Sequence, residues 1–224
     1  MIYLLLNFHL LRTYGSILFH YIWYQQWNSK PAQRWRKKDK QTGEIERINL
    51  VDEKSCLENP SEVAPQLYLG NVNHCTDHGL LNKYNISKIV NATRDIPNNF
   101  RATKYNIEYC RVKLFDTGNE VMTKNQLHES YEFLTKHIQN HHNILIHCYM
   151  GASRSASIVL YYLSRTYKIN VHDAMLRLYK LRKIICVNQI FVEAVILTLM
   201  NDWNQNRDQV TGNLESDFLL TNTT

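Results

Sequence analysis

A nine-residue stretch, His147-Cys148-Tyr149-Met150-Gly151-Ala152-Ser153-Arg154-Ser155, constrains the fold more than any other part of the sequence. The run before it, residues 143–147, is short, apolar and rich in β-branched residues, which is typical of a buried strand. The run after it, residues 155–163, is longer and apolar and begins with small hydroxyl residues, which predicts a buried helix. The stretch is therefore predicted to be the loop between a strand and a helix.

Such a corner can bind a phosphate-like anion, because backbone N–H groups of the loop and the positive end of the helix point to the same place. Cys148 is the only cysteine of the chain with an arginine, Arg154, six residues later. A thiol at a helix N-terminus ionises near or below neutral pH and is then nucleophilic. A guanidinium binds two phosphate oxygens and stabilises charge during phosphoryl transfer. The alternative is a buried structural cysteine beside a helix-capping arginine.

Other residues of the stretch have chemical roles that suit this interpretation. Gly151 permits a turn that a Cβ atom would obstruct. We expect the Ser155 hydroxyl to donate a hydrogen bond to the departing thiolate, and His147 to support the loop from below.

Asp116 is the candidate general acid. It follows a strand-like run, residues 109–115, and begins the turn-rich sequence Asp-Thr-Gly-Asn. When a thiolate attacks phosphorus, the leaving oxygen needs a proton, and a carboxylic acid on a nearby loop can supply it. The same carboxylate can then act as base toward the water that hydrolyses the phosphocysteine. The alternative is an aspartate that only shapes the turn.

The loop resembles a known family. His147-Cys148, Gly151 and Ser153-Arg154-Ser155 are similar to the His-Cys-x-x-Gly-x-Ser-Arg-Ser loop of the dual-specificity protein phosphatases, the shallow-pocket branch of the cysteine-based tyrosine phosphatases. The position of Asp116, thirty-two residues before Cys148, resembles that of the family's general acid. Residues 95–100 are similar to a loop of MAP-kinase phosphatases. The resemblance implies that residues 148–154 bind phosphate and that neither a metal nor an organic cofactor is needed.

The resemblance extends over residues 63–203 and implies an α/β fold, with a central mixed, mostly parallel sheet flanked by helices and an N-terminal helical extension. Alternating apolar patterns agree with this order of elements. A strand and a turn are predicted at 63–71, and further strands at 86–93, 109–115 and 143–147. Helices are predicted at 77–84, 123–140, 155–167, 171–179 and 188–203. The chain departs from the family pattern in residues 182–188, which contain no proline. Asn188 is kept and is expected to support the loop.

The regions outside the resemblance divide into three parts. Residues 1–29 are hydrophobic and aromatic, residues 30–62 form a basic, polar linker, and residues 204–224 are expected to be a disordered tail. Residues 34–40 carry five basic side chains and one acidic one. Such a pattern attracts anionic lipid heads, so peripheral membrane contact through residues 1–40 is one interpretation. The alternatives are an accessory helix with a solvated linker, or a basic segment that docks a MAP kinase.

Composition indicates the size of the core, the redox compartment and the kind of partner. The 224 residues, 44% of them hydrophobic, suffice for one catalytic core. Five cysteines without a clear secretory signal indicate a reducing compartment, so we expect a cytoplasmic protein, with membrane association and the nucleus left open. The net charge of +6 favours phosphorylated partners, and no motif indicates nucleic-acid binding. A metal site at His74, Cys75 and His78 is the less favoured interpretation of that cluster.

The predicted function is hydrolysis of phosphotyrosine and phosphoserine or phosphothreonine in proteins, with a MAP kinase as one candidate substrate. Three alternatives remain at this point. Two are phosphatases for phosphoinositides or RNA 5′-triphosphates, although phosphoinositide enzymes tend to place lysines in the loop and this loop has none. The third is a catalytically inactive module that binds phosphoproteins.

Overall fold

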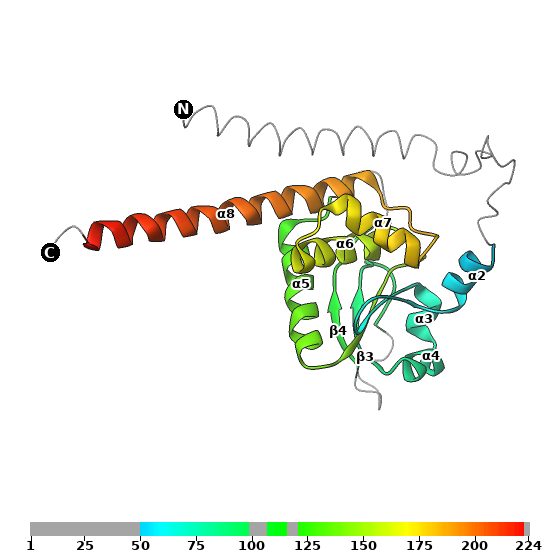
Figure 1. Ribbon diagram of the computed structural model, residues 1–224. Helices are drawn as coiled ribbons and strands as arrows, with labels where there is room; N and C mark the ends of the chain where they lie inside the picture. The colour runs from blue at the N-terminus through cyan, green and yellow to red at the C-terminus, as the bar shows by residue number, and fades with distance from the viewer. Residues whose placement is uncertain (1–49, 99–106, 116–120, 222–224) are drawn as a thin grey trace, which may run out of the picture. The chain divides into compact units, whose positions relative to one another are not determined.

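A computed structural model of the chain describes residues 50–98, 107–115 and 121–221. Helices and strands are interspersed along its chain (Figure 1). The helices are α2 (Leu50–Glu58), α3 (Val72–Thr76), α4 (His78–Lys83), α5 (Lys124–Gln139), α6 (Arg154–Tyr167), α7 (Val171–Leu181) and α8 (Gln189–Thr221), and the strands are β1 (Ser61–Ala64), β2 (Leu67–Gly70), β3 (Ile86–Asn91), β4 (Glu108–Arg111) and β5 (Asn143–His147). The hydrophobic segment 1–29 and the basic run 34–40 lie outside the described residues.

The sheet has five strands in the order β1-β2-β5-β3-β4. β1 pairs antiparallel with β2, whereas β2, β3 and β4 join the sheet through parallel pairings. The expected mixed, mostly parallel sheet is therefore confirmed. Gly70 of β2 and Asn91 of β3 both lie opposite His147 of β5. Three parallel strands thus end together at His147, and ligands of α/β sheets bind at such carboxyl ends.

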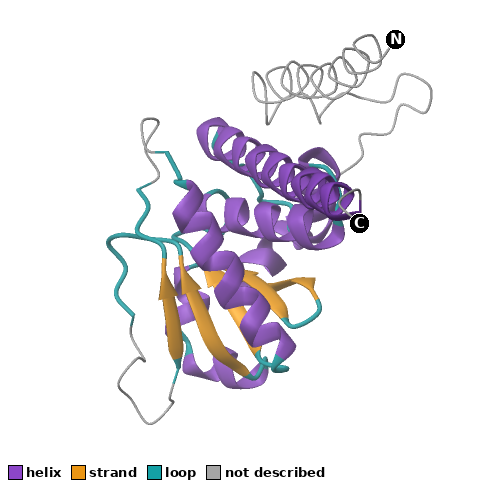
Figure 2. Cartoon of the chain, turned by 90° about the vertical axis from the view of Figure 1, so that its left-hand side faces the viewer, coloured by secondary structure: helices purple, strands orange, loops and turns teal. Residues whose placement is uncertain are grey.

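Helices cover both faces of this sheet (Figure 2). α3 and α4 contact β5 and β3 on one face, where a core forms around Cys75, Leu81, Ile86, Ile89, Ile107 and Leu145. Because side chains alternate along a strand, Ile144 and Ile146, on either side of Leu145, point to the other face. α5 and α6 contact β5 there, and α7 and α8 pack on α6. β5, which is buried from Ile144 to His147, therefore carries the loop that follows it.

The structure corrects two expected elements near the start of the domain. Residues 63–71 were predicted as one strand followed by a turn, but they contain the end of β1 and all of β2, which form a hairpin. Its turn contains Gln66 at φ 65°, a conformation that the sequence does not signal because glycine or asparagine usually occupies it. Helix α3 precedes the predicted helix 77–84, and its capping box is built from Asn71 and His74.

Both ends of the domain also differ from expectation. The predicted linker 30–62 contains helix α2, which forms because residues of the domain bind its last carbonyls, as described below. A disordered tail was predicted for 204–224, whereas helix α8 continues to Thr221. No proline interrupts this segment, and the single Gly212 costs only about 1 kcal/mol in a helix. Even so, no helix in the described part of the chain is both long and apolar enough to cross a bilayer.

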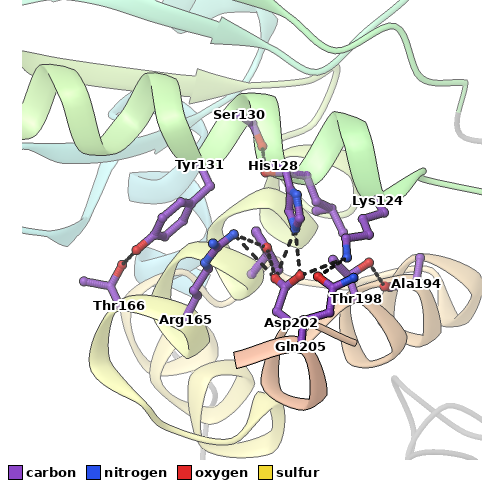
Figure 3. Close-up of polar contacts among 12 residues, drawn as sticks. Lys124, His128, Ser130, Tyr131, Arg165, Thr166, Ala194, Thr198, Asp202 and Gln205 are labelled. Carbon is purple, nitrogen blue, oxygen red and sulfur yellow. Dashed lines mark hydrogen bonds and ion pairs between the residues drawn. The ribbon is translucent and has the colours of Figure 1, made fainter. Parts of the chain in front are cut away.

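Helix α8 is joined to α5 and α6 by a polar network around Asp202 (Figure 3). The Asp202 carboxylate accepts a hydrogen bond of 2.7 Å from the Tyr161 hydroxyl and lies 2.9 Å from His128 Nε2. Lys124 Nζ lies 3.3 Å and Arg165 Nη1 3.5 Å from its oxygens. These contacts hold α8 at Asp202 against α5 and α6.

Candidate active site

The loop between β5 and α6 sits where the parallel strands end. Its turn depends on Gly151, which has φ +70°. A Cβ atom on Gly151 would lie 2.2 Å from the carbonyl oxygen of Gly70, so no other residue fits without moving β2. The expectation that this glycine is required by the turn is consistent with this geometry.

Four consecutive carbonyl groups of the loop, those of residues 149–152, accept hydrogen bonds from outside it. The donors are Val72 N to Tyr149 O at 3.0 Å, Arg182 Nη2 to Met150 O at 3.1 Å, Arg182 Nε to Gly151 O at 2.9 Å and Cys186 N to Ala152 O at 3.0 Å. In a trans peptide the N–H group points opposite to the carbonyl. The N–H groups of residues 150–153 therefore point into the loop and line a concavity whose donors suit an anion.

Cys148 lies at the floor of this concavity. Its side chain is 1% exposed, and its sulfur accepts two hydrogen bonds, at 3.2 Å from Gly151 N and 3.1 Å from Ser155 Oγ. The Ser155 hydroxyl therefore lies where it donates directly to the Cys148 sulfur.

Arg154 begins helix α6 and is 7% exposed. Its Nη1 donates to the carbonyl of Leu114 at 3.3 Å, and the same carbonyl accepts from the backbone N–H of Arg94 at 3.2 Å. The guanidinium is thus oriented by the strand-to-loop segment that leads toward residue 116. Asp116, the predicted general acid, lies outside the described residues.

His147 and Asn188, the two predicted supporting residues, both lie beside the loop. His147 is buried at the end of β5, and burial lowers its pKa to about 4, so the ring is neutral at pH 7. Asn188 acts through its backbone N–H, which donates to Ser153 Oγ at 3.1 Å. Its side-chain oxygen instead accepts from Ile190 N at 3.0 Å, at the start of α8.

Arg182 is the site residue that sequence reasoning missed. It is fully buried behind the loop and holds two of the four carbonyls described above. In the sequence it stands in a basic run after helix α7, which reads as a solvated loop. Only the tertiary structure reveals its contact, because the loop lies about thirty residues earlier.

In the cluster of His74, Cys75 and His78, the buried residues His74 and Cys75 make hydrogen bonds that hold the local structure. His74 Nδ1 accepts from Asn71 N at 3.1 Å, and its Nε2 donates to the carbonyl of Leu57 at 3.0 Å. The Cys75 thiol donates to the carbonyl of Val72, and burial raises its pKa to about 12. These atoms are engaged within the protein, so the less favoured metal interpretation gains no support here.

Comparisons with known proteins agree with this geometry. The family model of the dual specificity phosphatase catalytic domain matches residues 67–199. The dual specificity protein phosphatase Mpk3 of Drosophila melanogaster is 32% identical over 120 residues, which are 52% of this chain and 28% of that protein. A Slingshot homolog of Xenopus laevis is 31% identical over 136 residues, 61% of this chain and 19% of that protein. The chain thus spans less than a third of either relative.

Solved structures share the fold as well. The crystal structure of DUSP15 has a TM-score of 0.56 and 26% sequence identity, over 61% of this chain and 85% of that one. The family model covers more than half of the chain and includes the whole anion-binding loop. The chain therefore belongs to the dual specificity phosphatase catalytic-domain family.

Proposed function

We propose that this chain is a protein phosphatase that hydrolyses phosphotyrosine and phosphoserine or phosphothreonine through a phosphocysteine intermediate. The observation that carries the proposal is the buried Cys148 sulfur, which accepts two hydrogen bonds at the floor of a loop whose N–H groups converge. This arrangement combines a nucleophile with a site for the phosphoryl oxygens.

The reaction has two steps. In the first, the Cys148 thiolate attacks phosphorus, the bond from phosphorus to the substrate oxygen breaks, and Asp116 gives that oxygen a proton. In the second, water attacks the phosphocysteine, Asp116 takes a proton from the water, and the sulfur leaves as a thiolate. Arg154 and the loop N–H groups stabilise the charge on the phosphoryl oxygens in both steps. Ser155 stabilises the leaving thiolate through its hydrogen bond of 3.1 Å.

The assignment of Asp116 as the acid is supported by the chain that precedes it. Leu114 lies two residues before Asp116, and its carbonyl is bound to the Arg154 guanidinium. The chain therefore enters residue 116 from a point next to the phosphate-binding arginine. We therefore assign to Asp116 the proton transfer to the leaving oxygen of a phosphate held by the loop.

A protein substrate suits the rim of the loop. Tyr149 and Met150 are exposed at 58% and 49%, and Phe115, which follows the Leu114 carbonyl bound by Arg154, is 40% exposed. The Arg94 guanidinium lies 4.8 Å from the Phe115 ring centroid. Apolar side chains favour contact with the residues that flank a phosphorylated side chain. A phosphoinositide or a triphosphate would favour additional positive charge inside the loop, where the sequence places none.

The proposal extends to partners and location. Mpk3 is one of the relatives, and a MAP kinase is accordingly a candidate substrate. The basic run 34–40 supports either docking of such a kinase or contact of residues 1–40 with anionic lipid heads. The five cysteines, all of them free thiols, support a reducing compartment and hence a cytoplasmic location. No role for nucleic acid is proposed.

The test is phosphate release from a doubly phosphorylated Thr/Tyr peptide in the presence of a chelator, beside phosphoinositide and RNA 5′-triphosphate substrates. Peptide hydrolysis that is abolished in Cys148→Ser and slowed about a hundredfold in Asp116→Ala supports the proposal. Hydrolysis of only the lipid or the RNA substrate contradicts the substrate class. If wild-type protein binds the peptide without releasing phosphate, the chain is a binding module.

A further inference from the structure

Arg182 is the largest side chain that is fully buried in the described part of the chain. A buried guanidinium usually has a carboxylate partner, because an uncompensated buried charge is costly. The described partners of Arg182 are instead three backbone carbonyls and one hydroxyl: Cys56 O at 2.7 Å, Gly151 O at 2.9 Å, Met150 O at 3.1 Å and Ser61 Oγ at 3.3 Å. The charge is therefore placed to bind carbonyl dipoles.

These partners lie on two sides of the guanidinium. Nε and Nη2 bind the loop carbonyls, whereas Nη1 binds the carbonyl of Cys56. Cys56 belongs to the last turn of α2, whose carbonyls have no partner within the helix and carry the negative end of its dipole. One planar, rigid group thus bridges the end of α2 and the back of the phosphate-binding loop.

A second contact fixes the same end of α2. The carbonyl of Leu57 accepts from Asn71 Nδ2 at 3.1 Å and from His74 Nε2 at 3.0 Å. Asn71 immediately follows β2, whose last residue, Gly70, touches the loop at Gly151. The end of α2 is therefore connected to the loop in two ways. Arg182 contacts both directly, whereas Asn71 is connected to the loop through its neighbour Gly70.

The fit between Arg182 and the loop is tight. A Cβ atom on Gly151 would lie 2.8 Å from Arg182 Nη2, in addition to its clash with Gly70. A displacement of the guanidinium would therefore change the direction of the carbonyls of residues 150 and 151. Because the peptides are rigid, the N–H groups of residues 151 and 152 would turn away from the anion.

We propose that Arg182 is a positioning residue that couples the last turn of α2 to the phosphate-binding loop. Residues 50–58 precede the family domain at 67–199, so the coupling links the segment before the domain to the affinity of the loop for an oxyanion. The inference rests on the proposed function only in that the loop binds phosphate. A change that loosens the end of α2 weakens binding without touching a group that contacts the anion.

The experiment uses the full chain and tungstate, a non-hydrolysable oxyanion, in calorimetric titrations. Ser55→Pro breaks α2 just before Cys56, because proline lacks the N–H and clashes with the preceding turn, and Ser55→Ala is its matched control. The Ser55 side chain is exposed, so neither substitution removes a buried contact. Arg182→Gln and Arg182→Lys test the bridge itself. Arg177→Gln, at an exposed arginine of helix α7, which ends just before Arg182, controls for loss of charge.

The expected result is an affinity for tungstate reduced about threefold to tenfold in Ser55→Pro relative to Ser55→Ala, and tenfold to a hundredfold in Arg182→Gln. Arg182→Lys should retain only part of the wild-type affinity for tungstate, because an ammonium group cannot reproduce the planar array of donors of the guanidinium. Arg177→Gln binds as wild type does. Hydrogen exchange of residues 54–58 and thermal unfolding without tungstate separate local loosening from global unfolding.

The coupling is contradicted if α2 loses its exchange protection in Ser55→Pro while tungstate binds as in Ser55→Ala. If Arg182→Gln does not fold, the difference in tungstate affinity between Ser55→Pro and Ser55→Ala alone tests the coupling. Wild-type protein that binds tungstate but hydrolyses no phosphoester contradicts the proposed function and leaves the coupling measurable. Wild-type protein that does neither contradicts both.

Discussion

The environment of its sulfur separates Cys148 from the other buried cysteines. Cys75 donates its thiol proton to a carbonyl, and burial raises the pKa of Cys75 and of Cys110 to about 12. Cys148 has the opposite arrangement, because its sulfur only accepts, from Gly151 N and Ser155 Oγ. Burial without donors makes a cysteine inert, whereas burial with two donors prepares a nucleophile.

Removal of the Ser155 hydroxyl tests the stabilisation of the departing thiolate. Ser155→Ala should slow hydrolysis of the phosphocysteine on the order of tenfold to a hundredfold, because the loss affects the second step. Rapid-quench kinetics should then show a burst of leaving group that wild-type protein lacks or shows weakly. Ser164→Ala, at a buried serine farther along α6, should leave both phases unchanged. A uniform slowing of the burst and the steady state would assign Ser155 to the first step instead.

Replacement of Gly151 tests the shape of the loop. Gly151→Ala places a Cβ atom 2.2 Å from Gly70 O at a φ of +70°, so activity should be lost and the free energy of unfolding should fall by about 1 to 3 kcal/mol. Urea denaturation and phosphate release measure the two effects. Gly79→Ala should be harmless, since its Cβ atom meets only the Asp77 side chain at 3.1 Å. Full activity in Gly151→Ala would contradict the described loop geometry.

At the scale of elements, sequence reasoning succeeded where the pattern is local. β5 was predicted with its observed bounds, and α6 differs by one residue at its start, because a buried apolar run fixes both. The hairpin turn at Gln66 was missed because a non-glycine residue adopts positive φ there. Helix α2 was missed because its last carbonyls are satisfied by Arg182, Asn71 and His74, which are distant in sequence.

The Asp202 network supports a prediction about α8. Burial alone would raise the pKa of Asp202, but hydrogen bonds from Tyr161, His128 and Lys124 lower it below its usual value. Asp202→Asn removes this charge and should lower the free energy of unfolding by about 1 to 3 kcal/mol. Hydrogen exchange should show the largest loss of protection in α8. Glu193→Gln, on the same helix but outside the network, is the control. Equal stability of the two variants would show that the network contributes little.

At the scale of the whole molecule, the sequence predicted the fold and placed Cys148, Arg154 and Ser155 in one loop, and their catalytic roles stay predictions. These residues lie in one contiguous stretch, so their proximity follows from local structure. Arg182 was not predicted, because its role depends on the return of the chain to the back of the loop. The place of Asp116 relative to the loop remains a prediction, since that residue lies outside the described part.

Buried histidines make stability depend on pH. Burial lowers the pKa of His74 and His147 to about 4, and it lowers the pKa of His137 as well. Histidine in the unfolded chain titrates near pH 6.5. The folded state therefore binds these protons less readily, so stability is full above about pH 6.5 and falls as the pH decreases toward 4. The loss should reach roughly 3 kcal/mol each for His74 and His147.

Urea denaturation at a series of pH values measures this effect. A decline should already be present between about pH 6.5 and 5, where carboxylates in the unfolded chain remain ionised and contribute little. A free energy of unfolding that stays constant over this window would contradict the neutral, buried state of these histidines.

The measurement that tests the central claim most directly is the chemical identity of the covalent intermediate. Full-length protein is mixed with an aryl phosphate, quenched in acid within the first turnover, and digested for mass spectrometry. We expect phosphate on the peptide that contains Cys148, at a higher level in Ser155→Ala and at none in Cys148→Ser. Phosphate on a different residue, or release of phosphate by Cys148→Ser at the wild-type rate, would contradict the role of Cys148 as nucleophile.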